Sequence, residues 1–165
     1  MSTTGLLVMP PNKIIFGVFQ NTLGPLDKPC EEQSFHWSLV ALSSPMDATI
    51  FHIEGNADSF GYVTKQATHF RNSKTIRGGV KISEISEEQV AWIANTLSQV
   101  EIVRGDAVAF NCQTWCVRAL RLLRELDPSI VPQPFSEARI REEFVREYER
   151  WDTGEDTLDE REFPA

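Results

Sequence analysis

The sequence predicts a single α+β domain in which a small antiparallel sheet packs against helices. Its first half contains short apolar runs separated by turn-forming residues, and its second half contains apolar residues at helical spacing. At 165 residues with 41% hydrophobic content, the chain suits one adequate core and is too short for two ordinary domains. We expect this domain over residues 1–151, followed by a disordered acidic tail over residues 152–165.

The strand-like runs come first along the chain. Residues 13–19 are expected to form the first strand, and a loop with several Pro and Gly residues follows it. Residues 35–42 and 49–54 then predict a hairpin, because a polar turn separates two runs of alternating character. Weaker strand patterns cover residues 61–64 and 79–82.

Two of the three expected helices are marked by their caps. Ser86 and Gln89 have the spacing of a capping box in front of apolar residues at helical intervals, so a helix is expected to begin there. Ser136 is the expected N-cap of the last helix. The residues of that helix expected to face inward are Ile140, Phe144, Tyr148 and Trp151.

The middle helix carries a cysteine in its first turn. It is expected to begin near Asn111, after a strand-like run over residues 107–110, and to end at Asp127-Pro128. Backbone N–H groups in a first turn are unpaired and partly positive, so the Cys112 thiol is expected to lose its proton more easily than an ordinary thiol. The apolar stripe of this helix, which is expected to face the sheet, consists of Cys112, Trp115, Cys116, Ala119, Leu122, Leu123 and Leu126.

Charge and cysteine content exclude several classes of protein. The formal net charge of −8 disfavours binding to nucleic acid or to anionic lipid. No apolar run approaches the roughly 20 residues of a membrane helix. Cys30, Cys112 and Cys116 are an odd number without a regular disulfide spacing, and no secretory leader is recognisable, so we expect a reduced, cytoplasmic protein.

Two histidines lie in strand-like runs, where a polar ring is unusual. His36 precedes Trp37 in the first strand of the expected hairpin, and His52 follows Phe51 in the second. Side chains alternate across a strand, so the rings share a face when the numbers of paired residues sum to 88 or 90. Those registers put the two Cβ atoms roughly 5 to 8 Å apart. An odd register would put the rings on opposite faces.

In an even register, the thiol and the two imidazoles are the parts of a cysteine nucleophile site. His36 would take the proton of Cys112, and His52 would orient His36 through its other ring nitrogen. The thiolate would attack a carbonyl carbon and form a thioester, which water or another acceptor then resolves. The expected reaction is hydrolysis or transfer of an acyl group from an amide, ester or thioester, without a metal or another cofactor.

Residues around the nucleophile are candidates for binding the substrate. Backbone N–H groups of Cys112 and Gln113, with the Gln113 amide, would stabilise the oxyanion. Trp37 and Trp115 are core residues in one interpretation and walls of a substrate cleft in the other. Glu54 could shape the cleft, but it lies next to a Gly-Asn pair, which favours a role in a turn.

The combination of these motifs resembles a known group of enzymes. His36-Trp37 in one strand, His52 in the next and Asn111-Cys112-Gln113 at the start of a later helix resemble the circularly permuted papain-like thiol enzymes, especially the lecithin:retinol acyltransferase-like branch. The resemblance covers about residues 13–126 and implies a permuted papain-like fold with Cys112 as nucleophile, His36 as base and His52 as the third polar residue. The chain is also similar to small uncharacterised fungal proteins with the same motifs.

The resemblance leaves the substrate open. Lipid-processing relatives usually have Glu-His-Phe after the cysteine and a membrane-anchoring segment, whereas Gln113-Thr114-Trp115 stands here. The expected partner is a small-molecule or peptide acyl donor, because nothing in the sequence defines the leaving group. Proteolysis or isopeptide cleavage therefore ranks beside small-molecule chemistry, and the sequence assigns no oligomeric state.

Two interpretations of another kind use the same residues. Cys112 and Cys116 at i and i+4, with His36 and His52, would supply a Cys2His2 zinc site, although this spacing does not match compact zinc motifs. Alternatively, the protein is a non-catalytic binding module that retains the fold and has lost turnover.

Overall fold

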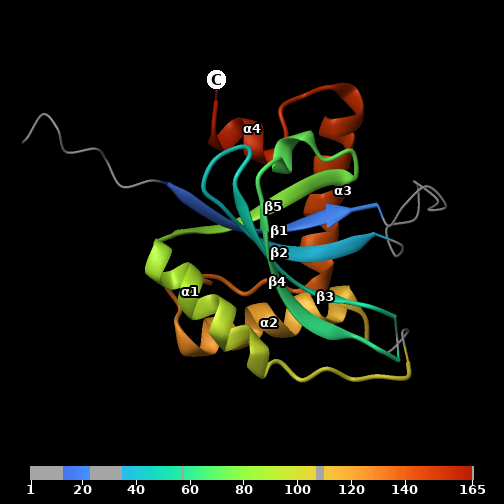
Figure 1. Cartoon of the computed structure of the whole chain (residues 1–165). Helices are drawn as coiled ribbons and strands as arrows, with labels where there is room; N and C mark the ends of the chain where they lie inside the picture. Colours follow the sequence, from blue (N-terminus) through green and yellow to red (C-terminus); the bar gives the residue numbers. More distant parts are fainter. Residues whose placement is uncertain (1–12, 23–34, 57, 107–109, 165) are drawn as a thin grey trace, which may run out of the picture.

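The computed structural model describes residues 13–22, 35–56, 58–106 and 110–164. A five-stranded sheet in the order β4-β3-β2-β1-β5, with antiparallel neighbours throughout, forms its centre (Figure 1). The predicted α+β class and antiparallel sheet are confirmed. The strands are β1 (Ile14–Asn21), β2 (His36–Leu42), β3 (Ala48–Glu54), β4 (Gly61–Ala67) and β5 (Ile76–Ile85).

The hairpin of β2 and β3 has an even register. Leu39 pairs with Phe51 and Val40 with Ile50, so the numbers of paired residues sum to 90. This is one of the two registers that put His36 and His52 on the same face. Pairing between β2 and β3 begins at Leu39, whereas pairing between β2 and β1 continues to His36. The first residues of β2 are therefore open on the side of β3.

Alternation along the strands gives the sheet two apolar faces. Trp37 and Leu39 of β2 point into the larger core, which also contains the buried residues of the three long helices. Val40 and Leu42 point to the other face, where a smaller cluster includes Leu158 near the C-terminus. Both faces are covered, so most of the central strands are buried.

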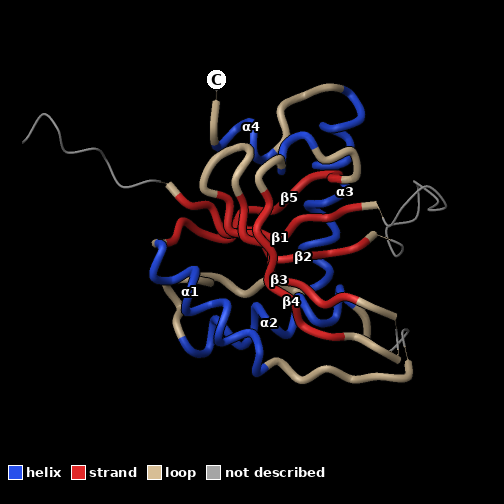
Figure 2. The backbone as a smooth tube through the Cα atoms, viewed as in Figure 1, coloured by secondary structure: helices blue, strands red, loops and turns tan. Residues whose placement is uncertain are grey.

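The helices begin where their caps predict. The capping box of Ser86 precedes α1 (Glu87–Thr96), and Ser136 caps α3 (Glu137–Thr153). The third is α2 (Cys112–Leu126), which lies against β2 and β3, while α3 lies against β5 (Figure 2). In the part of the chain that the structure describes, no helix has the length and apolar character to cross a membrane.

Two apolar stripes differ from expectation near their C-terminal ends. Leu126 is 53% exposed, and the buried position on α2 is taken by Leu120. Trp151 of α3 is 40% exposed and stacks under the Arg77 guanidinium, 3.9 Å from the ring centroid. Helical spacing alone does not show where a helix passes beyond the surface that it covers. Of the strand predicted over residues 107–110, all but Phe110 lies outside the described residues, as does Cys30.

The acidic C-terminal segment, predicted to be disordered, contains a helix. Residues of this segment form α4 (Leu158–Glu162), and Leu158 is buried. Its carboxylates have basic partners elsewhere in the chain: Lys81 donates to Glu162 at 2.8 Å, and Arg71 donates to Asp159 at 2.9 Å. The expectation of disorder was wrong because an acidic composition shows neither these ion pairs nor the burial of one leucine.

Glu147 joins α3 to α4. This carboxylate is 5% exposed, which is unusual for a charged group, and it accepts hydrogen bonds from the Leu158 backbone N–H at 3.1 Å and from Arg161 at 2.7 Å. A buried carboxylate is stable only with such partners. Glu147 therefore holds the start of α4 in place.

We predict that Glu147→Ala lowers the free energy of unfolding by about 2 to 4 kcal/mol, because the Leu158 N–H and the Arg161 guanidinium lose their acceptor. Urea denaturation measures the loss, and hydrogen exchange at the Leu158 amide should become faster. The matched control is Glu149→Ala on the exposed side of the same helix, which should change the free energy of unfolding by less than about 0.5 kcal/mol. Unchanged exchange at Leu158 in Glu147→Ala would contradict this role.

Candidate active site

Cys112 is the first residue of α2, and Asn111 fixes where the helix begins. The Asn111 side chain accepts hydrogen bonds from the backbone N–H groups of Gln113 at 2.9 Å and Thr114 at 3.3 Å. Thr114 Oγ1 accepts in turn from the Asn111 N–H at 3.3 Å, which completes a capping box. The predicted position of the thiol, in the first turn of this helix, is confirmed.

Cys112 Sγ lies where β2 and β3 separate. The backbone N–H of Trp37 donates to Sγ at 3.5 Å, and this N–H is available because β3 does not pair with β2 at this residue. Covalent geometry keeps Trp37 N within about 3.5 Å of His36 Cβ. Sγ is therefore no more than about 7 Å from His36 Cβ, which is within reach of the imidazole.

His36 and His52 contact each other across the gap between the two strands. His36 Nε2 is 2.8 Å from His52 Nδ1, and the ring planes cross at 74°. The even register is the cause, since it puts both side chains on the sheet face that α2 does not cover. The predicted contact between the imidazoles is confirmed.

Glu54, for which the sequence favoured a turn role over a role in the cleft, extends this pair. Its carboxylate is 3.2 Å from His52 Nε2, an ionic distance at which the alignment of a hydrogen bond is not met. It also forms an ion pair with Lys65 of β4. Glu54 is the last residue of β3 and shares a face with His52 two residues earlier, so strand alternation was the signal that could have found it.

Burial keeps the two imidazoles neutral. The pKa of His36 is lowered to about 4, first by desolvation and then by repulsion from His52, against the attraction of Glu54. The pKa of His52 is also lowered, mainly by desolvation, although Glu54 opposes the shift. Both rings are therefore uncharged near neutral pH.

The thiol is also neutral at rest. Desolvation raises the pKa of Cys112 and outweighs the backbone N–H groups around the sulfur and the Arg141 guanidinium, all of which favour the thiolate. The expectation that this thiol loses its proton more easily than an ordinary thiol is therefore wrong, although the N–H groups of the helix terminus do act in that direction. The partial charge of a helix terminus is small compared with the removal of a thiolate from water.

Gln113 has a structural role in place of the oxyanion role that the sequence predicts for its side chain. It is 2% exposed, its Nε2 donates to the Phe35 carbonyl at 2.9 Å, and its Oε1 accepts from Arg141. These contacts tie α2 and α3 to the residue before His36. The amide is thus engaged at both ends in positioning the start of β2.

Trp37 and Trp115 are core residues, which is one of the two interpretations that the sequence left open. Both indoles are fully buried. The Trp37 ring packs edge-on against Phe144 of α3, and the Trp115 ring stacks on Tyr62 of β4 with 5.5 Å between centroids. In this conformation neither ring lines a substrate cleft, so their predicted contact with substrate is not supported by the geometry.

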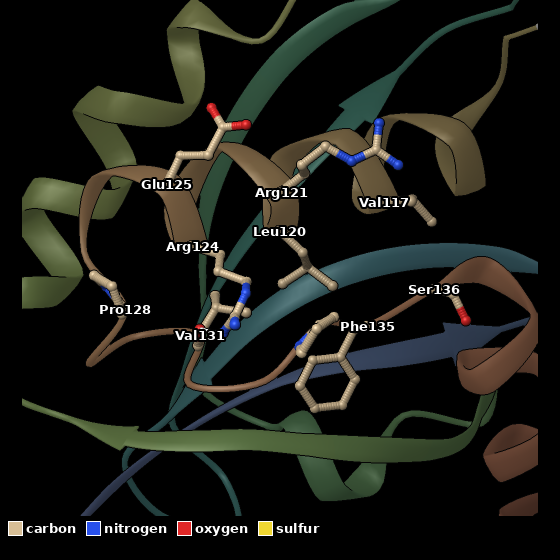
Figure 3. Close-up of a pocket in the computed structure, with 10 residues that line it drawn as sticks. Val117, Leu120, Arg121, Arg124, Glu125, Pro128, Val131, Phe135 and Ser136 are labelled. Atoms are coloured by element: carbon tan, nitrogen blue, oxygen red, sulfur yellow. Dashed lines mark hydrogen bonds between the residues drawn. The ribbon is translucent and has the colours of Figure 1, made fainter.

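Two hollows among the described residues lie near α2 and the histidine strands, and Cys112 is among the lining residues of neither. A hollow of about 490 Å³ lies against the C-terminal half of α2, where Arg121, Arg124 and Phe135 surround it (Figure 3). It includes neither Cys112 nor a histidine. A smaller pocket of about 240 Å³ is lined by His36 and His52. The chemistry of the site therefore points to the smaller pocket.

The zinc interpretation finds no ligand cluster. Within residues 13–22, 35–56, 58–106 and 110–164, no group of three or more His, Cys, Asp or Glu is arranged to hold a metal ion. Cys116, the second sulfur of that interpretation, is buried in the larger core one turn after Cys112.

The lowered pKa of His36 makes folding stability depend on pH. The unfolded chain protonates this ring near pH 6.5 and the folded chain only near pH 4, so acid favours the unfolded state. Its contribution to the free energy of unfolding, up to about 3 kcal/mol, is complete above pH 6.5 and is lost as the pH falls through 4. We predict that His36→Gln loses less stability than the natural chain between pH 7 and 4.5 in urea denaturation. Equal losses would contradict the assignment.

A family model matches residues 27–127 of the chain. The matched range contains β2, β3 and all of α2, and therefore His36, His52 and Cys112. No curated protein and no solved structure is significantly similar to the chain. Because the match spans more than half of the chain, the protein belongs to DUF6540, a family of unknown function.

Proposed function

We propose that this protein is a cysteine-dependent acyl-transfer enzyme, a hydrolase or an acyltransferase, with Cys112 as nucleophile, His36 as base and His52 as the group that orients His36. The observation that carries the proposal is the 2.8 Å contact between the imidazoles beside a sulfur held by the N–H that follows His36. Desolvating polar rings costs free energy. A purely structural strand pair would achieve its packing with apolar residues at lower cost.

The proton positions in this proposal follow from the contacts. A base needs a free lone pair, and His36 Nε2 is engaged with His52, so Nδ1 of His36 is the basic nitrogen. Nε2 of His36 then carries a hydrogen and donates it to His52 Nδ1. His52 in turn carries its hydrogen on Nε2, which is the nitrogen that faces Glu54. The chain of groups thus ends on a carboxylate that stabilises positive charge.

The reaction begins from neutral groups. Cys112 Sγ attacks the carbonyl carbon of the acyl donor while His36 Nδ1 takes the thiol proton, and the imidazolium then gives this proton to the leaving group. Water or another acceptor attacks the thioester, its proton passes to His36, and the C–S bond breaks. The proton returns to sulfur and the thiol is restored. Proton transfer accompanies attack, since no thiolate is stored at rest.

Backbone groups supply the oxyanion donors in this proposal. The N–H groups of Trp37 and Cys112 lie beside the sulfur, as does that of Gln113, which also donates to the Asn111 cap, so Trp37 and Cys112 are the proposed donors. Donors fixed by a strand and a helix terminus need no rearrangement when charge develops on the carbonyl oxygen. The Gln113 side chain is not required for this task.

A permuted papain-like arrangement is part of the proposal. Three observations support it: the chain order of His36, His52 and Cys112, the antiparallel sheet, and a helix that begins with the cysteine and lies against the histidine strands. A binding module would share these features. Covalent trapping separates the two functions, because only an enzyme forms an acyl adduct.

We predict that 4-nitrophenyl acetate acetylates the natural chain on one residue, Cys112, as detected by intact mass spectrometry. Cys112→Ala should abolish the adduct, and His36→Ala should slow acylation by about 10²- to 10⁴-fold because the general base is lost. His52→Ala should be milder, since this ring acts through His36. Cys116→Ala is the control and should keep the adduct. An adduct on Cys112→Ala, or equal rates in all variants, would refute the assignment.

The resting protonation states predict the pH dependence of acylation. The rate should be level near neutral pH, where His36 is free to accept a proton, and should fall as the pH drops through about 4, where His36 becomes protonated. Stopped-flow release of nitrophenolate at constant ionic strength measures the profile. The rate at which iodoacetamide alkylates Cys112 tests the resting state. A rate that does not change with pH around neutrality would show a stored thiolate–imidazolium pair and would contradict our proton scheme.

A further inference from the structure

The pocket beside the histidines is assembled from distant parts of the chain. Its volume is about 240 Å³, and it lies on the sheet face opposite α2. Ser38 of β2 and Ile50 of β3 line it next to His36 and His52. Phe70 and Thr75, from the connection between β4 and β5, also line it, as do Asn21 and Thr22 at the end of β1. Polar and apolar groups thus face one another across a small space.

Ser38 is the polar residue next to the histidines in this pocket, and the proposed reaction does not use it. It is 4% exposed, and it lines the pocket beside His36 and His52. In the register of the hairpin it stands opposite His52. A nearly buried hydroxyl that lines a pocket beside two imidazoles is a ready hydrogen-bonding group for an occupant.

The chemistry of the reaction says what must occupy this position. His36 protonates the leaving group and deprotonates the acceptor, so both must come within hydrogen-bond distance of its ring. A pocket lined by His36 is therefore where the leaving group departs and the acceptor arrives. Its volume is below the roughly 300 to 1,000 Å³ of pockets for complete drug-sized ligands, which leaves room for one small group.

The lining also selects by charge. Among the described residues, the lining contains no Lys, Arg, Asp or Glu, so a charged occupant would lose its hydration without gaining an ionic partner from them. The Ser38 hydroxyl matches an alcohol, and Ile50 and Phe70 match a short carbon skeleton, whereas the Thr75 hydroxyl already accepts a hydrogen bond from Asn21 at 3.2 Å. The neutral histidines add no net charge.

The geometry points to this pocket as the acyl-acceptor subsite, selective for a small uncharged alcohol; this inference rests on the proposed acyl-enzyme chemistry. The hydroxyl oxygen attacks the thioester carbonyl carbon and forms a new C–O bond, while its proton passes to His36. The C–S bond then breaks, and the proton moves from His36 to the Cys112 sulfur. The products are an ester and the free thiol.

The test compares acceptors of equal shape and different charge. The chain is acetylated with 4-nitrophenyl acetate, freed of excess reagent and mixed with propane-1,2-diol or lactate, and in parallel with 3,3-dimethylbutan-1-ol or choline. Mass spectrometry gives the ratio of acetyl ester to acetate for each acceptor. We expect this transfer-to-hydrolysis ratio to be at least tenfold higher for the neutral member of each pair.

Variants of the pocket supply the second arm. Ile50→Phe fills the space and should lower the ratio for both neutral alcohols by about tenfold, and Ser38→Ala should lower it by several-fold through loss of one hydrogen bond. Gln66→Phe is the matched control, because Gln66 is exposed on β4 and shares the other sheet face with Tyr62. Its ratio should equal that of the natural chain. Thermal unfolding checks that each variant folds. If Ile50→Phe does not fold, the comparison of ratios is made with Ser38→Ala.

The outcomes separate the two proposals. Failure to form any acetyl-enzyme would overturn the proposed function itself. An acetyl-enzyme that is resolved by water alone, or equally by neutral and charged acceptors, would overturn the acceptor subsite and leave the thioester chemistry standing. The acceptor subsite would also be overturned if Ser38→Ala and every folded pocket variant kept the transfer-to-hydrolysis ratio of the natural chain.

Discussion

The separation of β2 from β3 before Leu39 is the constraint on which the site depends. If the pairing continued, β3 would occupy the position beside Trp37, and its N–H could not donate to the Cys112 sulfur. The edge of β2 would then be closed to α2. With the edge open, a thiol from one side of the sheet meets imidazoles from the other. The same opening explains why the sulfur is so poorly hydrated, since backbone surrounds it. The contact of the sulfur with the Trp37 N–H and its desolvation therefore have one structural cause.

Much of this arrangement is encoded locally. The capping residue Asn111 fixes where α2 begins, so the place of the thiol follows from a few adjacent letters. Alternation within β2 and β3 restricts the histidines to two outcomes, same face or opposite faces, and the turn between the strands selects the first. The sequence pattern therefore predicts both arrangements and indicates that only the same-face arrangement lets the two rings touch. The antiparallel sheet and the helix caps are of the same local kind.

The features that the sequence did not reveal all depend on contacts between segments far apart. The thiol pKa reflects backbone from β2 and a guanidinium from α3, neither of which a helix-start rule includes. The commitment of Gln113 to Phe35 requires knowing that the two elements adjoin. The helix near the C-terminus forms because Asp159 and its neighbours make ion pairs with basic residues that lie far away in the sequence. Composition describes what a segment contains and says nothing of what it touches.

One link in the fold joins the part of the chain that the family model matches to a part outside it. Arg71 donates to Asp159 of α4, and it directly follows Phe70, which lines the histidine pocket. The C-terminal helix is therefore linked to the pocket through two adjacent residues. The family match ends at residue 127, well before α4. The matched range thus contains Cys112, His36 and His52, whereas α4, which adjoins the histidine pocket through Arg71, lies outside it.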